Sequence, residues 1–345
     1  MISSIYSVAR FIHRLSARKH GGVATFDAHL KAISRKHGLP LIPLSTFSHC
    51  ISYLKVRHRL PSYHIAVLSA AAVIICPLLP AANQVVFMHG SRGLRRSIKW
   101  SIPTITLAFA YYFVIKPRNI RVASNSMLTS AVNFLSFGLK SIPVGLPFDP
   151  GIRSMLTHYI GDITNVETSS AKGFLLIYCG VANPDKNIPG ILNVVNKLSL
   201  EGYNCLVSPI TPLKSLPYFY AYFENILPAE QIHNKIKRGY IPCLVNPCVY
   251  EPFGYVFLEA LSCGIPAIYS NGAGIDFYSR LLPGLIQFNF LRTDYHFSSD
   301  NISESPTLAK MITEASLYCS GQARRNAFNM YYNTILSNIK YIINA

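Results

Sequence analysis

The chain has 345 residues, of which 50% are hydrophobic and 14% are charged, and its formal net charge is +17. This composition excludes an intrinsically disordered chain and leaves enough residues for two domains of ordinary size. Residues 1–150 carry a net charge of +16, whereas residues 151–345 carry +1. A basic half is typical of proteins that bind nucleic acid, anionic lipid headgroups or phosphorylated ligands, and a solvated surface without a partner is the simpler alternative.

The eight cysteines are scattered along the chain without a C-x-x-C pair. This pattern favours buried free thiols in a reducing compartment over a disulfide scaffold or a zinc site. Residues 1–12 are mildly apolar, but a basic run without a cleavage pattern follows them, so we expect no cleavable signal peptide. The sequence therefore predicts a cytoplasmic protein.

The N-terminal half alternates strand-like and helix-like segments. The predicted strands are 39–45, 64–69, 84–90 and 119–124, and the predicted helices are 24–38, 70–79 and 125–138. The apolar run within 64–90 is about long enough to span a membrane, but Pro77 and Pro80 interrupt it. We therefore interpret this run as strand, short helix and strand of a parallel sheet, whose strands are apolar on both faces.

The C-terminal half restarts the alternation after a polar, irregular segment. Its predicted strands are 173–180, 203–210, 241–247 and 265–271, its predicted helices are 187–202, 229–239 and 255–264, and the last forty residues are predicted to be helical. Two successive βαβ series predict an α/β fold with two doubly wound, Rossmann-like domains that face each other across a cleft.

The predicted domain organisation follows from this alternation. We expect a basic N-terminal domain at 1–150, a linker at 151–172 and a second Rossmann-like domain at 173–320. A C-terminal helix at 321–345 could pack back on the N-terminal domain. Ligands of such sheets bind at the carboxyl ends of the strands, so the loops at those ends are the places to look for a site.

Two glutamates flank a Pro-Phe-Gly turn in the apolar stretch 246–274. Glu251 lies in the loop after a predicted strand, and Glu259 lies inside the helix that follows Gly254. The helix start offers free N–H groups and a positive dipole end that suit a phosphate. The two carboxylates can accept hydrogen bonds from paired hydroxyls, as on a sugar ring and a ribose. The alternative is a capping carboxylate and an ordinary helical glutamate.

The segment "PCVYEPFGYVFLEALSCGIPAIYSNGAG" resembles the donor-binding signature of the family 4 retaining glycosyltransferases, which have the GT-B fold. The signature is Glu, seven residues and Glu (E-x7-E), and Cys248 stands where Ser is usual. The resemblance implies that Glu251 holds hydroxyls of the transferred sugar and that Glu259 holds the ribose. It also implies that backbone amides face the sugar and the diphosphate at Phe253, Gly254 and Tyr255.

Three weaker matches occur in the order that the family has. Gly21 and Gly22 resemble its N-terminal Gly-Gly loop, and His89 resembles the strand-end histidine near the reacting sugar. Lys186 matches a lysine that neutralises the diphosphate, whereas Val181 stands at a position that is usually Arg. By this resemblance His89, Lys186 and Glu251 are the catalytic candidates. Taken singly, the Gly-Gly pair is typical of a turn, and His89 of an ordinary strand end.

The resemblance also implies the chemistry and the substrates. A nucleotide sugar, UDP- or GDP-linked, would donate its sugar with retention of configuration, by attack on the face from which the leaving group departs. No obligatory metal or other cofactor is implied, because Lys186 and helix dipoles would stabilise the leaving diphosphate. We expect a saccharide acceptor, most simply lipid-linked, in the biosynthesis of cell-surface polysaccharide such as lipopolysaccharide.

The segment "SRGLRRSIKW", residues 91–100, concentrates four of the basic residues of the N-terminal half within ten positions. In a helix one face would gather Arg92, Arg95, Arg96 and Lys99, with Trp100 beside them as an interfacial anchor. We therefore predict peripheral association with the anionic inner face of the membrane, close to the acceptor. Direct binding of an acceptor phosphate by these four residues is the alternative, as is no ligand.

Two other classes of function remain open. The basic half could bind nucleic acid, although its cations are not interleaved with aromatic residues in a recognisable RNA-binding motif, so no nucleic acid is expected. The chain could also be a non-catalytic GT-B subunit that regulates a partner, and Val181 is the best support for this. Nucleotide-sugar titration tests the first alternative, and activity of the isolated chain tests the second.

Overall fold

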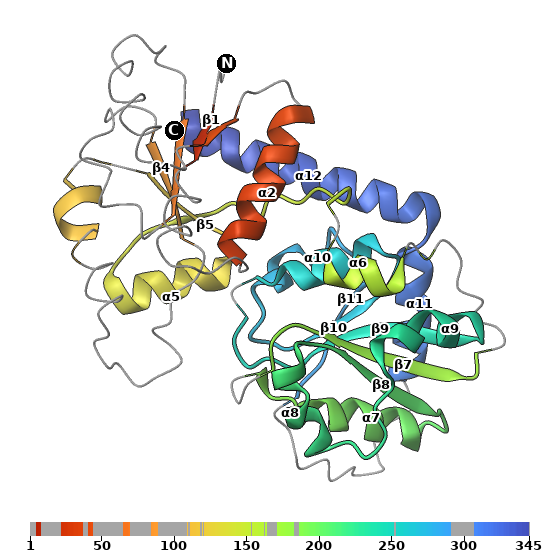
Figure 1. Ribbon diagram of the computed structural model, residues 1–345. Helices are drawn as coiled ribbons and strands as arrows, with labels where there is room; N and C mark the ends of the chain where they lie inside the picture. Colours follow the sequence, from red (N-terminus) through yellow and green to blue (C-terminus); the bar gives the residue numbers. More distant parts are fainter. Residues whose placement is uncertain are drawn as a thin grey trace. The chain divides into compact units, whose positions relative to one another are not determined.

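The apolar runs of the sequence form two separate parallel sheets (Figure 1). The structure is a computed structural model, and the residues that it describes are 5–7, 22–36, 41–43, 65–69, 84–88, 109, 111–117, 119, 121–152, 154–161, 163, 171–182, 186–251, 253–290 and 307–344. The chain divides into two units. Unit 1 comprises Met1–Ile152 and Tyr332–Ala345, and unit 2 comprises Arg153–Tyr331.

The sheet of unit 1 has the strand order β2-β1-β3-β4-β5-β6, and all its pairs are parallel. Its strands are β1 (Ile5–Ser7), β2 (Leu41–Pro43), β3 (Ile65–Ser69), β4 (Gln84–Met88), β5 (Arg121–Ser124) and β6 (Ile142–Pro143). Strands β3 and β4 pair directly with each other, as expected for the two β-rich ends of the 64–90 stretch. The helix predicted between them lies outside the described residues.

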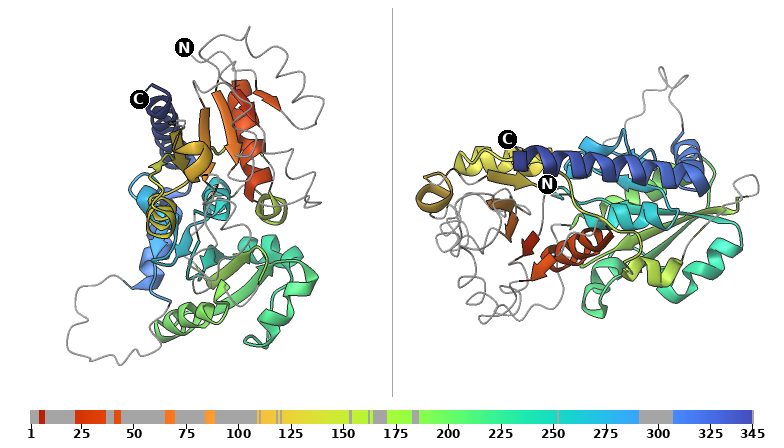
Figure 2. Two further views of the ribbon diagram at one scale, coloured as in Figure 1. Left: turned by 90° about the vertical axis from the view of Figure 1, so that its left-hand side faces the viewer. Right: turned by 90° about the horizontal axis from the view of Figure 1, so that it is seen from above.

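The helices of unit 1 lie beside these strands. They are α2 (Gly22–Lys36), the π-helix η3 (Tyr111–Ile115) and α5 (Met127–Phe137). Figure 2 shows α2 alongside the sheet. Helix α5 begins where the Ser126 hydroxyl accepts a hydrogen bond from the Thr129 amide, at 3.1 Å, and ends at Gly138, whose φ of +62° favours glycine. The sequence predicted α2 and α5 but not η3.

A buried histidine joins α2 to the segment after β6. The Nδ1 atom of His29 accepts a hydrogen bond from the Asp149 amide at 2.9 Å, and the imidazole packs against Phe148 with ring centroids 4.8 Å apart. Burial lowers the pKa of His29 to about 4, although the nearby Asp149 opposes this shift. The imidazole is therefore neutral at neutral pH and serves here as a hydrogen-bond acceptor within the core.

The sheet of unit 2 has the order β11-β10-β9-β7-β8, and its pairs are also parallel. Its strands are β7 (Gly173–Cys179), β8 (Cys205–Ile210), β9 (Tyr240–Asn246), β10 (Ala267–Tyr269) and β11 (Leu285–Gln287). Its helices are α6 (Met155–Ile160), α7 (Gly190–Leu200), η5 (Leu213–Ser215), α8 (Pro217–Tyr220), η6 (Ala229–Gln231), α9 (Ile232–Lys237), α10 (Tyr255–Ser262), η7 (Gly274–Tyr278) and α11 (Leu308–Tyr318).

The helices of unit 2 cover both faces of its sheet. Figure 1 shows α7 and α8 on one side and α6 and α10 on the other. The apolar stripe of α7 (Ile191, Val194 and Leu198) packs with α11 residues such as Ile312 against the strands. Because both faces are covered, β7 and β9 are almost entirely buried, which explains their continuous apolar runs.

Each sheet reverses its strand order once. In unit 2 the chain passes from β7 to the edge strand β8 and then returns to the other side of β7 with β9, so the reversal lies between β7 and β9. In unit 1 the corresponding reversal lies between β1 and β3. Adjacent loops diverge at such a point, and open α/β sheets bind their ligands in the crevice that results.

The sequence did not predict several of the observed elements. The segment expected as an irregular linker, 151–172, contains α6, whose capping box joins Ser154 and Thr157. Strands β1 and β11 have only three residues each, too few for a periodic pattern. The last helix, α12 (Gly321–Asn344), belongs to unit 2 up to Tyr331 and to unit 1 from Tyr332.

Candidate functional site at the ends of β7 and β9

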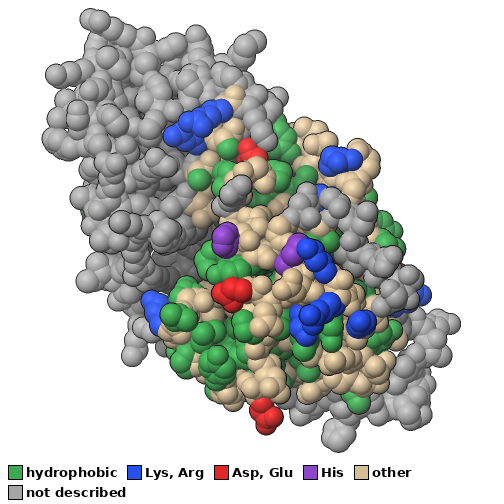
Figure 3. Space-filling view, turned by 45° about the vertical axis from the view of Figure 1, so that its right-hand side comes forward, with side chains coloured by type: hydrophobic (Ala, Val, Ile, Leu, Met, Phe, Trp, Pro, Cys, Tyr) green, Lys and Arg blue, Asp and Glu red, His purple; other side chains and the backbone are tan. Residues whose placement is uncertain are grey.

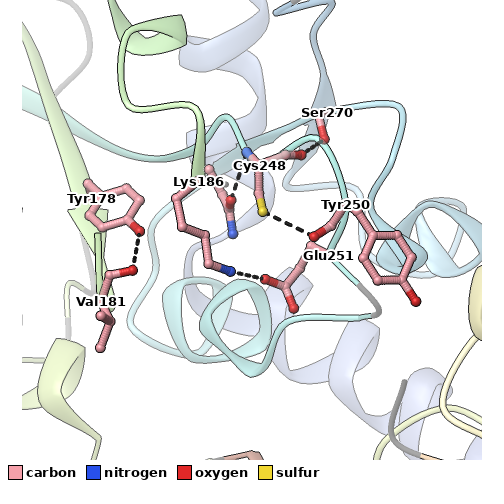
Figure 4. A network of polar contacts seen from close by, with 8 residues as sticks. Tyr178, Val181, Lys186, Cys248, Tyr250, Glu251 and Ser270 are labelled. Carbon is pink, nitrogen blue, oxygen red and sulfur yellow. Dashed lines mark hydrogen bonds and ion pairs between the residues drawn. The ribbon is translucent and has the colours of Figure 1, made fainter. Parts of the chain in front are cut away.

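The reversal point of unit 2 brings together a lysine and a glutamate that are 65 positions apart (Figure 4). Lys186 follows β7 and Glu251 follows β9, and the Lys186 Nζ atom donates a hydrogen bond to Glu251 Oε2 at 2.9 Å. Their side chains are 24% and 18% exposed, so solvent still reaches both. The sequence singled out both residues, and the structure places them in direct contact.

The loop after β7 is attached to the loop after β9. Asn187 has a positive φ of 48°, and its side-chain amide donates a hydrogen bond to the Pro247 carbonyl at 3.2 Å. The next helix begins at Gly190, where a Cβ would lie 2.7 Å from Asn187 Nδ2 and 3.0 Å from Pro247 Cβ, so a side chain does not fit. This close approach positions the neighbouring Lys186 over the end of β9.

The loop after β9 is held by hydrogen bonds within it and to the residues that flank it. The Cys248 amide donates to Asn246 Oδ1 at 3.2 Å, and the Ser270 hydroxyl donates to the Cys248 carbonyl. The Cys248 thiol donates to the Tyr250 carbonyl at 3.1 Å. The cysteine that replaces the usual serine therefore still supplies a hydrogen-bond donor to this turn, although a thiol is a weaker donor than a hydroxyl.

The backbone of Glu251 is fastened to the loop after β10. Its amide donates to the Gly272 carbonyl at 3.0 Å, and its carbonyl accepts from the Gly274 amide at 2.8 Å. Gly272 approaches so closely that a Cβ would lie 1.8 Å from the Val249 carbonyl oxygen. The carboxylate of Glu251 thus projects from a backbone position held on both sides, which limits the conformational entropy that it would lose on binding a ligand.

Helix α10 begins directly after this loop. Gly254 precedes it with a φ of +80°, and Phe253 is fully buried with its ring centroid 5.7 Å from that of Tyr278. Phe253 therefore anchors the turn with its side chain, and any contact of this residue with a ligand is through its backbone. The first amides of α10, from Tyr255 onward, lie at the positive end of the helix dipole.

The second carboxylate, that of Glu259, lies inside α10. Burial raises the pKa of Glu259 above its ordinary value, and a hydrogen bond from the Ser154 hydroxyl opposes this shift. Burial also raises the pKa of Cys179, the last residue of β7, and the charge of Glu259 adds to this shift. Glu259 is therefore close enough to the end of β7 to affect its last residue.

The end of β7 carries no cation at position 181. Val181 is 51% exposed, its carbonyl accepts a hydrogen bond from the Tyr178 hydroxyl at 3.1 Å, and its side chain points away from Lys186 (Figure 4). The valine therefore cannot substitute for the missing guanidinium. This leaves Lys186 as the cation within reach of Glu251 in the part of the loop that the structure describes.

Other predicted site residues lie largely outside the described residues. Gly22 is the first residue of α2. His89 comes directly after the last residue of β4 but is not itself described. The remaining predicted residues that are not described are Gly21, Arg92, Arg95, Arg96 and Lys99. The proposed histidine and the basic membrane segment therefore remain predictions.

Sequence reasoning missed the residues that position the site. Asn187 is one, and its only signal is that asparagine tolerates the left-handed conformation, here two residues before a Pro-Gly pair. Ser154 is another, because its bond to Glu259 joins residues that are far apart in sequence. Within the described ranges no group of three or more His, Cys, Asp and Glu side chains is arranged to hold a metal ion. No helix among them is both long and apolar enough to cross a membrane.

Comparison with known proteins identifies the fold. No protein-family model matches the sequence, and no curated protein matches it either. Among solved structures, sucrose-phosphate synthase from Thermosynechococcus elongatus is similar with a TM-score of 0.55 and 12% identity over 99% of this chain and 98% of that chain. HepE of Anabaena in complex with UDP gives 0.53 and 11% over 100% and 99%, and its complex with UDP-glucose gives 0.52 and 11% over 99% and 98%.

At these identities the similarity concerns the fold. The neighbours are GT-B proteins, and their similarity extends over nearly the whole of both chains. The chain therefore has the GT-B fold with two Rossmann-like domains, which confirms the predicted fold class.

Proposed function

We propose that this chain, which has the GT-B fold, transfers a sugar from a nucleotide-sugar donor to a saccharide acceptor. The observation that carries the proposal is the contact between Lys186 and Glu251 at the reversal point of the unit 2 sheet. A cation and a carboxylate held side by side suit a ligand that has phosphate next to hydroxyl groups. HepE, which has the same fold, has been solved with UDP, with UDP and glucose, and with UDP-glucose.

The two charged groups would exchange partners when the donor binds. The Lys186 ammonium would turn from Glu251 to the diphosphate, where it stabilises the charge that develops on the leaving group. The Glu251 carboxylate would then accept hydrogen bonds from hydroxyls of the sugar. Glu259, inside α10, would accept from the ribose hydroxyls. The ion pair thus holds both groups in place before the ligand arrives.

The finer features of the reaction rest on the sequence resemblance. We propose retention of the anomeric configuration, with attack from the face that the leaving group departs from, and a UDP- or GDP-linked donor. Lys186 and the first turn of α10 supply positive charge to the diphosphate, so an obligatory metal ion is not required by this scheme. His89 is the residue that the resemblance implies near the reacting sugar, and it lies outside the described residues.

We further propose that the acceptor is lipid-linked and that unit 1 lies on the anionic inner face of the membrane. Unit 1 contains 19 Lys and Arg but only 2 Asp and no Glu, a net charge of +17, whereas the 13 basic and 13 acidic residues of unit 2 cancel. Unit 1 also exposes large apolar side chains. They are 51–82% exposed and comprise Phe109, Phe113, Phe134 and Leu135, the apolar surface of unit 1.

This apolar surface has two parts that approach each other. Phe109 and Phe113 stack with their ring centroids 4.5 Å apart, and Phe134 and Leu135 lie in the last turn of α5. Between them, the Tyr112 hydroxyl lies 3.5 Å from the position that a Cβ on Gly138, the C-cap of α5, would occupy. Exposed apolar side chains on a strongly basic unit favour a lipid surface, where both burial and charge contribute. Nucleic acid is the competing polyanion, but the cations of the basic half are not interleaved with aromatic residues in a recognisable RNA-binding motif. On the face drawn in Figure 3, the Lys and Arg side chains that are described stand in separate groups.

Nucleotide binding and sugar transfer test the proposal. The purified full-length chain should be stabilised against heat by UDP or GDP and should transfer a sugar from the corresponding nucleotide sugar to a lipid-linked acceptor. Lys186→Ala should lose about 2–4 kcal/mol of transition-state stabilisation, as expected for one preorganised electrostatic partner. Lys310→Ala, an exposed lysine on α11, is the matched control. Nucleotide binding without any transfer would favour a non-catalytic subunit, and binding of nucleic acid instead of nucleotides would refute the proposal.

A further inference from the structure

The loop that follows β8 lies against the loop that follows β7. At the strand ends the Gly180 amide donates to the Ile210 carbonyl at 3.0 Å, and farther out the Ser215 hydroxyl donates to the Ala182 carbonyl at 3.4 Å. These two contacts hold the short helix η5 (Leu213–Ser215) beside the loop in which Val181 stands. Lys214, the central residue of η5, is therefore a neighbour of the position that lacks a cation.

The charge of the proposed ligand requires more than Lys186 supplies. A nucleoside diphosphate carries at least two negative charges at neutral pH, and Lys186 is itself paired with Glu251 at 2.9 Å. In sequence, the segments that directly follow β7, β8 and β9 are 180–189, 211–216 and 247–254. They contain two Lys or Arg residues in all, Lys186 and Lys214. Lys214 is exposed, so its ammonium can move toward a ligand at little cost.

A second observation at the same loop indicates a ligand. Thr211 comes directly after β8, and its hydroxyl is buried without a hydrogen-bond partner. A buried hydroxyl without a partner costs about 1–3 kcal/mol, and most such groups in proteins are satisfied by protein, water or ligand. Thr211 lies three residues before Lys214 in the same loop. Rotation of the Thr211 side chain toward a phosphate near Lys214 would give its hydroxyl a partner.

We propose that Thr211 and Lys214 bind the phosphate next to the nucleoside, and that Lys214 supplies the positive charge that Val181 cannot. The inference rests on the proposed function, since it names the second cation of the same donor site. Lys186 then holds the phosphate next to the sugar, beside Glu251. The two phosphates would thus lie at the ends of the adjacent strands β7 and β8, with the sugar beside the end of β9.

Binding of nucleoside diphosphates to the full-length chain tests the assignment. By calorimetry, Lys214→Ala should weaken binding of UDP or GDP about tenfold or more, as for the loss of one charge-assisted contact, and should leave the affinity for free uridine or guanosine unchanged. Lys214→Arg should retain most of the affinity. Thr211→Val should also weaken binding of the diphosphate, whereas Lys310→Ala should leave this binding unchanged.

A rescue variant separates a binding role from a general loss of charge. Adding Val181→Arg to Lys214→Ala should restore diphosphate affinity, because an arginine at 181 would occupy the place where the resemblance expects one. Unchanged diphosphate affinity in Lys214→Ala would overturn the assignment. It would also be overturned if affinity were lost only in Arg280→Ala, a change of the arginine two residues after η7. A wild-type chain that binds neither UDP nor GDP would overturn the proposed function together with this inference.

Discussion

At the residue scale, the site depends on side chains whose environments differ although their chemistry is the same. Glu251 is paired with Lys186 and partly open to solvent, whereas Glu259 is more deeply desolvated and has a raised pKa. The first can exchange its partner for a sugar hydroxyl without leaving solvent. The second is held by Ser154 and is suited to a ligand group that replaces or joins this hydrogen bond.

Replacing each carboxylate by the neutral amide should affect a different step, transfer for one and nucleotide binding for the other. Glu251→Gln should mainly lower the rate of transfer, because this residue contacts the sugar that changes in the transition state. Glu259→Gln should mainly weaken nucleotide binding. Single-turnover rates and calorimetric Kd values for UDP and GDP distinguish these effects, and Glu314→Gln on α11 is the control. Wild-type rates and affinities in both variants would show that the site is wrongly assigned.

At the scale of elements, the site rests on loops that are fastened to one another. The loop after β7 is bonded to that after β9 through Asn187, and the loop after β9 is bonded to that after β10 through Glu251 and Gly272. Each loop follows a short, buried parallel strand, so the strands set where the loops begin. The contacts between loops then decide where the polar side chains lie. These loops keep their positions only if the helices that pack around the strands are stable.

The N-terminus of helix α11 is capped by a side chain at the end of helix α7. The Glu201 carboxylate, at the C-cap of α7, accepts hydrogen bonds from the Leu308 and Ala309 amides of α11 at 3.0 and 2.8 Å. Glu201→Ala should therefore lower the free energy of unfolding by about 1–3 kcal/mol, since it removes a charged acceptor from partly buried amides. Urea denaturation measures the change.

The matched control is a glutamate in an exposed pair on the same helix. Glu314 lies 3.9 Å from Lys310, and their side chains are 55% and 65% exposed. Glu314→Ala should change the free energy of unfolding by less than about 1 kcal/mol, because exposed ion pairs contribute little. An equal loss of stability in the two variants would contradict the capping role of Glu201.

At the scale of the whole molecule, the formal net charge lies in unit 1. The division of the chain assigns +17 to unit 1 and zero to unit 2, which is a sharper separation than the two halves of the sequence give. The reason is that the last residues of α12 belong to unit 1 and contribute Lys340. A basic unit joined to a neutral one suits an enzyme that takes one substrate from an anionic surface and the other from solution.

Binding to liposomes should depend both on the apolar surface of unit 1 and on its basic residues. Co-sedimentation should increase with the fraction of anionic lipid and decrease with salt, because charges near the surface are screened within a Debye length. Phe113→Ser should weaken binding at any salt concentration, whereas changing Arg92, Arg95 and Arg96 to Ser should mainly reduce its salt dependence. Leu200→Ser, at an exposed apolar residue of unit 2, is the control. Equal binding to neutral and anionic vesicles would refute the membrane proposal and leave the transferase proposal intact.

Much of the fold could be predicted because its signals are local. Buried strands such as β7 and β9 are continuous apolar runs, and helices such as α7 have an apolar stripe, so both are recognisable within a few residues of sequence. The two glutamates were recognisable for a similar reason, since their spacing within one loop and one helix is itself local. The three-residue strands β1 and β11 and the helix α6 were missed because so short a segment has no period.

By itself, the sequence determined the alternation of strands and helices and the two parallel sheets, and it singled out the candidate site residues Lys186, Glu251 and Glu259. Only the tertiary structure decided that β9 returns beside β7, which places Lys186 against Glu251 and Ser154 against Glu259. It also decided that the loop bearing Lys214 lies beside Val181. The physical reason is that strand order follows from how whole helices cover both faces of the sheet, and no local pattern of residues encodes which distant loops that packing brings together.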